Sequence, residues 1–346
     1  MLRKINGIQY LRGLFAIVVV LYHWSGSFQK FYTHDLMKNF FAQGYLGVDL
    51  FFLISGFVIF LSTKSMIDRR DYFIRRFSRV LPVYWIALVL LIGIRFLAGI
   101  LLHQDFFHDF SVTYLLRNVF LFPSEPYIIG PAWSLTYEVA FYIFFAIFCL
   151  GKKESIVVLA GIIGFLGLNF LAKEAGIQFF PRSINFLFGI FAAVLYGKPW
   201  IKNCPKLFYR LLLTALLIYF FTFFSVEKNE LAFDQTFRYM LLVSFPGALL
   251  ILACSAHDFS GQGIIQRTLT ILGESSYSIY IFHTIFLMVI IKVFPTTGIS
   301  YYDDLLYGLT LVVSLVAICI FSSLFEKKII KFTTLYLKMY FKSEKK

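Results

Sequence analysis

The sequence predicts an all-α, polytopic integral membrane protein of about ten transmembrane helices, with both termini in the cytoplasm. The 346 residues are 59% hydrophobic and only 15% charged, and their mean hydropathy is +0.77, which is far from the composition of a soluble domain. The net charge of +13 comes from lysines and arginines in short clusters between apolar runs. This distribution indicates membrane topology and argues against nucleic-acid binding.

The first apolar run follows a short basic N-terminus, and no small-residue cleavage site comes after it, so we expect an uncleaved first span. Further apolar runs follow without a linker, a repeat or a soluble domain between them, and the sixth span is the shortest. The expected spans are Gly7–Ser25, Gly44–Lys64, Val80–Leu102, Pro131–Gly151, Ile156–Leu171, Ser183–Gly197, Leu207–Phe224, Tyr239–Cys254, Ile271–Ile291 and Leu305–Phe325.

With the N-terminus inside, most lysines and arginines fall in the inner segments, which places both termini in the cytoplasm. We expect a multi-pass protein of the cell inner (plasma) membrane. Residues 1–326 form the expected transmembrane domain. Residues 327–346 mix lysines with apolar side chains, so we expect a basic amphipathic tail on the cytoplasmic membrane surface.

Two polar residues bracket the first span on one helix face. Arg12 and His23 are eleven positions apart, almost a whole number of turns, which places them about 16 Å apart along one stripe. A central arginine costs roughly 2.5–3.5 kcal/mol on the insertion scale. The pair therefore suggests a function, although Arg12 could also reach the headgroups and His23 could be a satisfied polar residue.

The expected topology places four ionisable side chains in the outer half of the membrane: His23, Asp49, Glu138 and His283. Ionisable residues at this depth usually face a bundle interior or a water-filled cavity. One layer of four such residues suggests a single site.

Neighbouring polar residues share faces with this layer. Ser134, Glu138 and Tyr142 align at i, i+4 and i+8, and Ser276, Tyr280 and His283 align at i, i+4 and i+7. The alternative is hydrogen bonding between helices, worth about 0.6 kcal/mol per contact.

A second constellation lies on the inner side. Arg75, Arg76 and Arg79 precede the third span at spacings of three and four, where guanidinium groups can bind phosphates in a bidentate manner. A topology anchor is the alternative. The four cysteines form no CxxC pair, so we expect no metal site.

At these residues the chain resembles acyltransferase family 3, the multi-span membrane O-acyltransferases. The resemblance covers nearly the whole chain, in family order. The matching motifs are Arg12-x10-His23, the run from Gly47 to Phe57, Arg75-Arg76-x2-Arg79, Trp133-Ser134-Leu135-x2-Glu138, and Leu272-Gly273 through His283. The family often has Glu-x-Pro near the end of the last span, but here Lys327 and Lys328 follow Glu326. This departure leaves the role of Glu326 open.

The resemblance implies transfer of an acyl group, usually acetyl, from cytoplasmic acyl-CoA to a hydroxyl of a cell-surface polysaccharide or glycolipid. Coenzyme A phosphates would bind the three clustered arginines with Arg12. His23 would be the general base, oriented by Glu138 or Asp49. Ser134, Tyr142 or backbone amides near Gly56 would support the oxyanion, and His283 lies in the same layer. A covalent acyl-enzyme remains open, and glycan-biosynthesis proteins are candidate partners.

Two other functions fit parts of the pattern. A proton-coupled secondary transporter of a small polar solute or glycan precursor would also need intramembrane charges, but the sequence has no obvious repeat or paired broken helices. A structural subunit of a glycan export complex would not need the polar layer. Acyl-CoA hydrolysis or transfer by the purified protein separates the enzyme from both.

Overall fold

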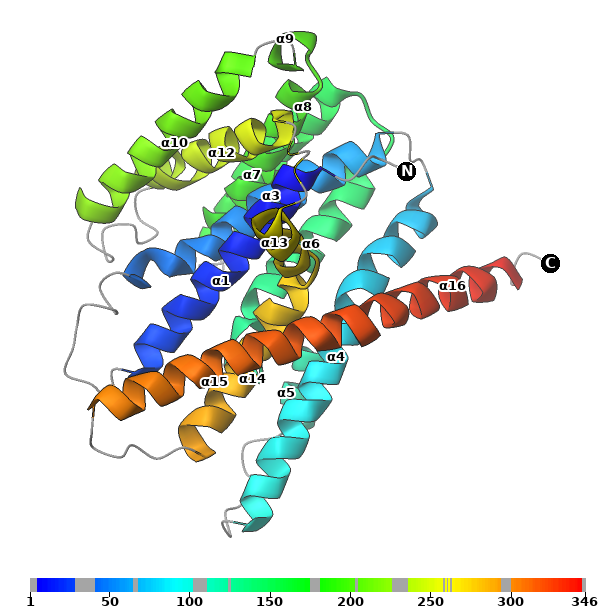
Figure 1. Ribbon diagram of the computed structural model, residues 1–346. Helices are drawn as coiled ribbons and strands as arrows, with labels where there is room; N and C mark the ends of the chain where they lie inside the picture. The colour runs from blue at the N-terminus through cyan, green and yellow to red at the C-terminus, as the bar shows by residue number, and fades with distance from the viewer. Residues whose placement is uncertain are drawn as a thin grey trace. The chain divides into compact units, whose positions relative to one another are not determined.

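The computed structural model describes residues 5–28, 41–64, 68–101, 111–123, 126–174, 181–202, 205–225, 236–257, 259, 261, 263–293 and 300–343. Every regular element within these residues is helical, which confirms the all-α class (Figure 1). The chain divides into two compact units. Unit 1 holds residues 1–29, 33–69 and 143–276, and unit 2 holds residues 30–32, 70–142 and 277–346.

Unit 1 is built on three helix pairs: α3 packs along α8, α1 along α13, and α10 along α12. A buried apolar cluster of Leu46, Ile184, Tyr239 and Val243 joins the short helices η1, α11 and η5 to α8. The helices of unit 1 are α1 (Asn6–Phe28), η1 (Ala42–Leu46), α3 (Gly47–Thr63), α7 (Glu154–Glu174), η4 (Pro181–Ser183), α8 (Ile184–Tyr196), α9 (Pro199–Lys202), α10 (Pro205–Ser225), α11 (Thr236–Tyr239), η5 (Met240–Ser244), α12 (Phe245–Ala256) and α13 (Ile264–Glu274).

Two glycines allow α3 and α8 to approach each other backbone to backbone. A Cβ atom on Gly56 would lie 2.1 Å from the carbonyl oxygen of Phe186, and one on Gly189 would lie 2.0 Å from that of Leu53. Small residues permit such contacts between helices in a membrane, where the hydrophobic effect does not drive association. The sequence analysis named the backbone amides near Gly56 as candidate oxyanion donors. In the structure, Gly56 allows α3 to pack against α8.

Unit 2 contains the longest helices. Helix α15, the π-helical turn η6 and α16 follow one another without a break, and Figure 1 shows them as one rod from orange to red. The helices of unit 2 are α4 (Arg69–Leu101), α5 (Val112–Val119), η3 (Gly130–Ala132), α6 (Trp133–Phe148), whose residues from Ile143 belong to unit 1, α14 (Ser276–Val293), α15 (Ser300–Phe321), η6 (Ser322–Glu326) and α16 (Lys327–Ser343).

One buried asparagine ties the segment after α5 to its neighbours. The side-chain amide of Asn118 donates to the carbonyl of Tyr114 at 3.0 Å, and its oxygen accepts from the backbone N–H of Ile128 at 2.9 Å. The hydroxyl of Tyr84, on α4, donates to the Asn118 carbonyl at 2.7 Å. These hydrogen bonds satisfy backbone N–H and C=O groups, which lipid tails cannot hydrogen-bond.

Two expected spans need correction. Helix α4 begins at Arg69 and not at Val80, so the three clustered arginines lie inside a helix instead of in a preceding loop. The expected ninth span is interrupted, because α13 ends at Glu274 and α14 begins at Ser276. Among the described residues, five helices are long and apolar enough to cross a membrane, or six if the interrupted pair counts as one span.

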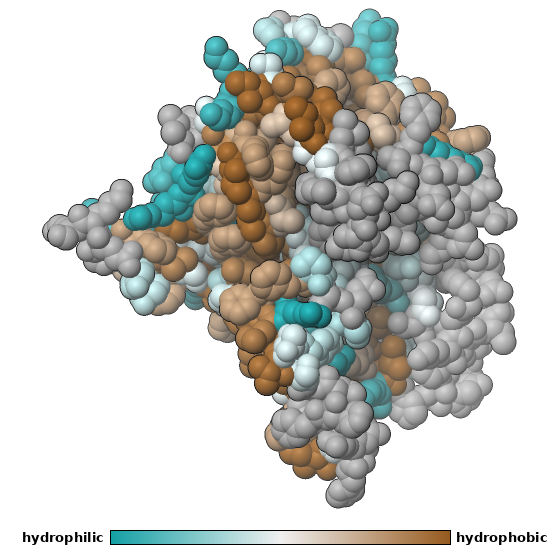
Figure 2. Space-filling model, turned by 180° about the vertical axis from the view of Figure 1, so that it is seen from behind, coloured by the Kyte–Doolittle hydropathy of each residue, from teal (hydrophilic) through white to brown (hydrophobic). Residues whose placement is uncertain are grey.

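Exposed apolar side chains follow the helices at helical spacing. Along α15 most of them lie three or four residues apart, and one adjacent pair adds to the same stripe: Leu305, Leu309, Val312, Val313, Val316 and Ile320. Brown, apolar side chains also form long stretches on the face drawn in Figure 2. A helix with such an exposed apolar stripe is suited to contact lipid, which identifies a membrane protein.

Candidate active site

His23 lies in the last part of α1. Its Nδ1 is 3.0 Å from the carbonyl oxygen of Val19, one turn earlier. A carbonyl oxygen only accepts, so Nδ1 carries the proton in this contact and Nε2 carries the lone pair. This tautomer is suited to a general base that takes a proton at Nε2.

Arg12 lies on the same unbroken helix, as the spacing predicts. Its guanidinium donates to the hydroxyl of Ser276 at 2.9 Å, and Ser276 is fully buried where α13 gives way to α14. The cation therefore has a polar partner at membrane depth, as such residues require.

Asp49 is fully buried in α3 and is paired with an arginine. Its Oδ2 and Oδ1 accept from Nη1 of Arg182 at 3.0 and 3.3 Å. The amide of Asn185 also donates to Oδ1 at 3.2 Å. A buried ion pair is stable only with such additional hydrogen bonds. These bonds join the carboxylate to Arg182 and Asn185 instead of the expected His23.

The same network continues to η5. The Asn185 amide nitrogen also lies 2.8 Å from the hydroxyl of Tyr239, and the hydroxyl of Ser244 donates to Asn185 Oδ1 at 2.8 Å. Ser244 ends the π-helical turn η5. We call Asp49, Arg182, Asn185, Tyr239 and Ser244 the Asp49 cluster. Its amide and hydroxyl groups surround one carboxylate and one guanidinium.

A second, partly buried cluster lies in unit 2. Tyr142 donates to Oε1 of Glu138, one turn earlier on α6, at 2.5 Å, as their spacing predicts. Arg76 and Arg79, on α4, lie within electrostatic range of the Tyr142 hydroxyl, and Arg76 also lies near Glu138. Tyr277, on α14, lies near the same carboxylate. We call these five residues the Glu138 cluster.

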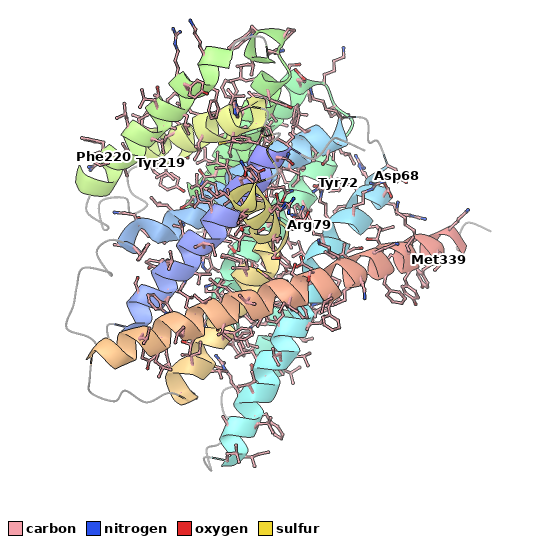
Figure 3. The ribbon with its side chains drawn as sticks, viewed as in Figure 1. Asp68, Tyr72, Arg79, Tyr219, Phe220 and Met339 are labelled. Atoms are coloured by element: carbon pink, nitrogen blue, oxygen red, sulfur yellow. The ribbon has the colours of Figure 1, made fainter. Side chains whose placement is uncertain are left out.

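The arginines of this cluster are held differently from Arg75. The guanidinium of Arg76 lies over the ring of Tyr72, 5.7 Å from its centroid, and Figure 3 labels Tyr72 and Arg79 on α4. Arg75 is exposed, and its Nε donates to Asp71 at 2.6 Å. The arginine motif therefore separates into two half-buried cations and one surface ion pair.

Glu326 is a buried carboxylate whose surroundings the sequence did not predict. Its Oε2 accepts from the hydroxyls of Ser278 at 2.7 Å and Ser322 at 2.5 Å. The π-helical turn η6 contains both Ser322 and Glu326. The only signal in the sequence was the family's Glu-x-Pro motif. Glu326 matches its first position, but Lys327 and Lys328 follow, so the motif is incomplete. Tyr277 lies within electrostatic range of this carboxylate as well.

The remaining predicted residues form hydrogen bonds between α6 and α14. The hydroxyls of Ser134 and Tyr280 are 2.7 Å apart, and they lie 2.9 and 3.1 Å from the carbonyl oxygen of Pro131. One hydroxyl donates to the other, and the second donates to this carbonyl. His283 is buried, with Nδ1 2.8 Å from the Tyr280 carbonyl. The predicted faces of these helices do meet, through hydrogen bonds of the kind that holds helices together.

The expected layer of four ionisable residues is thus divided by unit. His23 and Asp49 belong to unit 1, and Glu138 and His283 belong to unit 2. Within the described residues, no group of three or more histidine, cysteine or acidic side chains could hold a metal ion.

Arginines and carboxylates enclosed among apolar helices are typical of functional sites in membrane proteins. The comparison with known families is more specific: a family model described as "Acyltransferase domain" matches residues 5–324. The chain therefore belongs to acyltransferase family 3.

Relatives carry compatible names. The chain is 25% identical over 326 residues to a protein of Staphylococcus aureus strain COL named "Putative O-acetyltransferase", covering 82% of this chain and 50% of that protein. It is 26% identical over 287 residues to the exopolysaccharide production protein ExoZ of Rhizobium meliloti strain 1021, covering 78% and 85%. The chain spans about half the length of the Staphylococcus relatives. No solved structure matches it.

Proposed function

We propose that the protein transfers an acetyl group from cytoplasmic acetyl-CoA to a hydroxyl of a cell-surface polysaccharide or glycolipid, with His23 as general base. The observation that carries this proposal is the contact between His23 Nδ1 and the Val19 carbonyl, which leaves the lone pair on Nε2. A neutral imidazole in this tautomer can accept a hydroxyl proton near neutral pH. The relative named for exopolysaccharide production supports a polysaccharide acceptor.

The step balances with two substrates. His23 Nε2 takes the proton of the acceptor hydroxyl as its oxygen attacks the thioester carbonyl carbon. The tetrahedral intermediate collapses with cleavage of the C–S bond, and the imidazolium returns the proton to the departing coenzyme A sulfur. Hydrogen-bond donors would stabilise the oxyanion. Tyr142 and Ser134 are the predicted candidates, and each hydroxyl would first release its present acceptor, the Glu138 carboxylate or the Pro131 carbonyl.

Arg76 and Arg79 are the proposed donor site. Two guanidinium groups accompany one carboxylate in the Glu138 cluster, which leaves an excess of positive charge suited to phosphate. By the positive-inside rule, α4 starts at the cytoplasmic side, where acyl-CoA is present. Arg75 would contribute more weakly, since Asp71 already binds it.

The test is release of coenzyme A thiol from acetyl-CoA by the purified protein in nanodiscs, with and without a polysaccharide acceptor. We expect His23→Ala to lower kcat by about a hundredfold to ten-thousandfold. His257→Ala is the matched control, because His257 stacks on Phe208 with ring centroids 4.2 Å apart and has no place in the proposed reaction. Near-normal turnover by well-folded His23→Ala protein would overturn the general-base role.

A further inference from the structure

Helix α16 carries its charge on one side and exposed apolar side chains beside it. Its charged residues are all lysines, and successive residues turn by about 100°, which places Lys327, Lys331, Lys338 and Lys342 along one stripe. A second stripe beside it holds large exposed apolar residues. The exposed fractions are 71% for Phe332, 51% for Leu335, 55% for Tyr336 and 66% for Met339.

The start of α4 holds α16 at the edge of the lysine stripe that faces away from the apolar stripe, where Lys338 and Phe341 lie. Lys338 forms an ion pair with Asp71, and Arg70 donates to the carbonyl of Phe341 at 2.9 Å. The Arg70 guanidinium also lies over the Phe341 ring, 5.2 Å from its centroid. On the helical wheel, Phe341 lies roughly opposite Met339. The apolar stripe therefore stays exposed while the helix is anchored, and Figure 3 labels Met339 on α16.

The continuous helix formed by α15, η6 and α16 is too long to lie wholly within the hydrocarbon of the bilayer. The apolar helix from Leu305 to Lys342 has 38 residues, or about 57 Å at 1.5 Å per residue, against about 30 Å of bilayer hydrocarbon. The lipid-facing stripe of α15 occupies the first half. When α15 crosses the bilayer, α16 therefore starts near the headgroups, on the side that the lysines indicate is cytoplasmic.

We propose that α16, together with Arg70 near the start of α4, is a docking surface for anionic phospholipid headgroups of the cytoplasmic leaflet. Phe332, Leu335 and Met339 lie at the boundary of headgroups and acyl chains, and the lysine stripe binds phosphates. Charge complementarity selects this partner: α16 has five lysines and no acidic residue, and a basic stripe beside an apolar stripe is typical of helices that bind anionic membranes.

The test follows oxidation of Met339 by hydroxyl radicals in the whole protein, in nanodiscs of phosphatidylcholine alone or of phosphatidylcholine and phosphatidylglycerol in equal parts. Trp200, which is 57% exposed on α9, serves as the internal reference. We expect phosphatidylglycerol to lower Met339 oxidation at least about fivefold, because one lysine–headgroup contact corresponds to about that factor.

A triple variant identifies the lysines as the cause. Replacing Lys327, Lys331 and Lys342 by Gln should abolish the dependence on phosphatidylglycerol. Replacing Lys152, Lys153 and Lys206, three exposed lysines elsewhere, removes the same charge and should preserve it. Equal oxidation of Met339 in both lipids, or protection that survives in the Lys327, Lys331 and Lys342 variant, would overturn the proposal. So would protection that appears only when another protein is added.

Discussion

The Asp49 cluster and the Glu138 cluster both bury charge among apolar helices, yet they balance that charge differently. In the Asp49 cluster one carboxylate meets one guanidinium, and Asn185 binds the same carboxylate and links it to further hydroxyls. In the Glu138 cluster two guanidinium groups, from Arg76 and Arg79, accompany one carboxylate. The balanced cluster is suited to a structural role, and the positive excess of the Glu138 cluster is the reason for proposing it as the donor site.

The largest expected effect tests the balanced cluster. Asp49→Ala should lower the free energy of unfolding by about 3–5 kcal/mol, because Arg182 would remain buried without its counter-charge. Chemical denaturation of the purified protein in detergent measures this loss.

A paired replacement distinguishes a structural ion pair from a catalytic one. Asp49→Leu combined with Arg182→Met removes both charges and should recover most of the stability, since apolar groups of similar volume often replace a buried pair at little cost. The double variant should also retain acyl transfer. A stable double variant without activity would show that Asp49 takes part in the chemistry after all.

The next effect tests the unbalanced cluster. Arg76→Ala should raise KM for acetyl-CoA about tenfold to a hundredfold, because one charge-assisted contact with a phosphate is worth roughly 1.5–3 kcal/mol. Arg79→Lys should be a partial substitute, since lysine keeps the charge but loses the planar fork. Initial rates at varied acetyl-CoA and acceptor measure both constants.

Arg75→Ala is the control within the same motif. Its guanidinium is exposed and already bound to Asp71, so the KM for acetyl-CoA should change less than in Arg76→Ala. If all three arginine variants shift only the acceptor KM, the cluster does not bind the donor.

A smaller effect tests the close packing of α3 against α8 in unit 1. Gly56→Ala should destabilise the protein by about 1–3 kcal/mol, because the new methyl group would overlap the Phe186 carbonyl. Gly93→Ala is the matched control: a Cβ there meets nothing within 4 Å, and alanine favours a helix over glycine. Equal melting temperatures for the two variants would contradict the close approach of α3 and α8.

The smallest effect concerns Glu154, which precedes the expected fifth span. A hydrogen bond from Lys64 at 2.9 Å, helped by the charges of Lys64 and Lys198, lowers the pKa of Glu154 below its usual 4.5. A lowered pKa stabilises the fold above pH 4.5 and loses this contribution as the pH falls through the folded value. The side chain is 42% exposed, so solvent and salt limit the gain to well under about 1 kcal/mol.

Glu154→Gln measures this contribution. The melting temperature of the variant should be slightly below that of the natural protein at pH 7. The gap should close in strong acid and in high salt, because protonation and screening both remove the ion pair. A gap that persists under both conditions would indicate packing instead of charge.

The helical spacing of polar residues in the sequence predicted which side chains share a face of one helix. It aligned Glu138 with Tyr142, and it placed Ser134 and Tyr280 on faces that meet. It could not predict which distant residue neutralises Asp49, because Arg182 lies more than a hundred positions away and outside any apolar run. It also placed the start of α4 too late, since charged residues such as Arg69 continue a helix as readily as apolar ones do.

The π-helical turn η6 sets the rotational phase between two helices. An α-helix turns by about 100° per residue, so a single extra residue in this turn decides which side of α16 meets α4. Deleting one residue between Ser322 and Glu326 would rotate α16 by about that angle. Glu326 would leave its two serine donors, and Lys338 would swing away from Asp71. One residue of chain length therefore couples the buried Glu326 carboxylate to the orientation of α16.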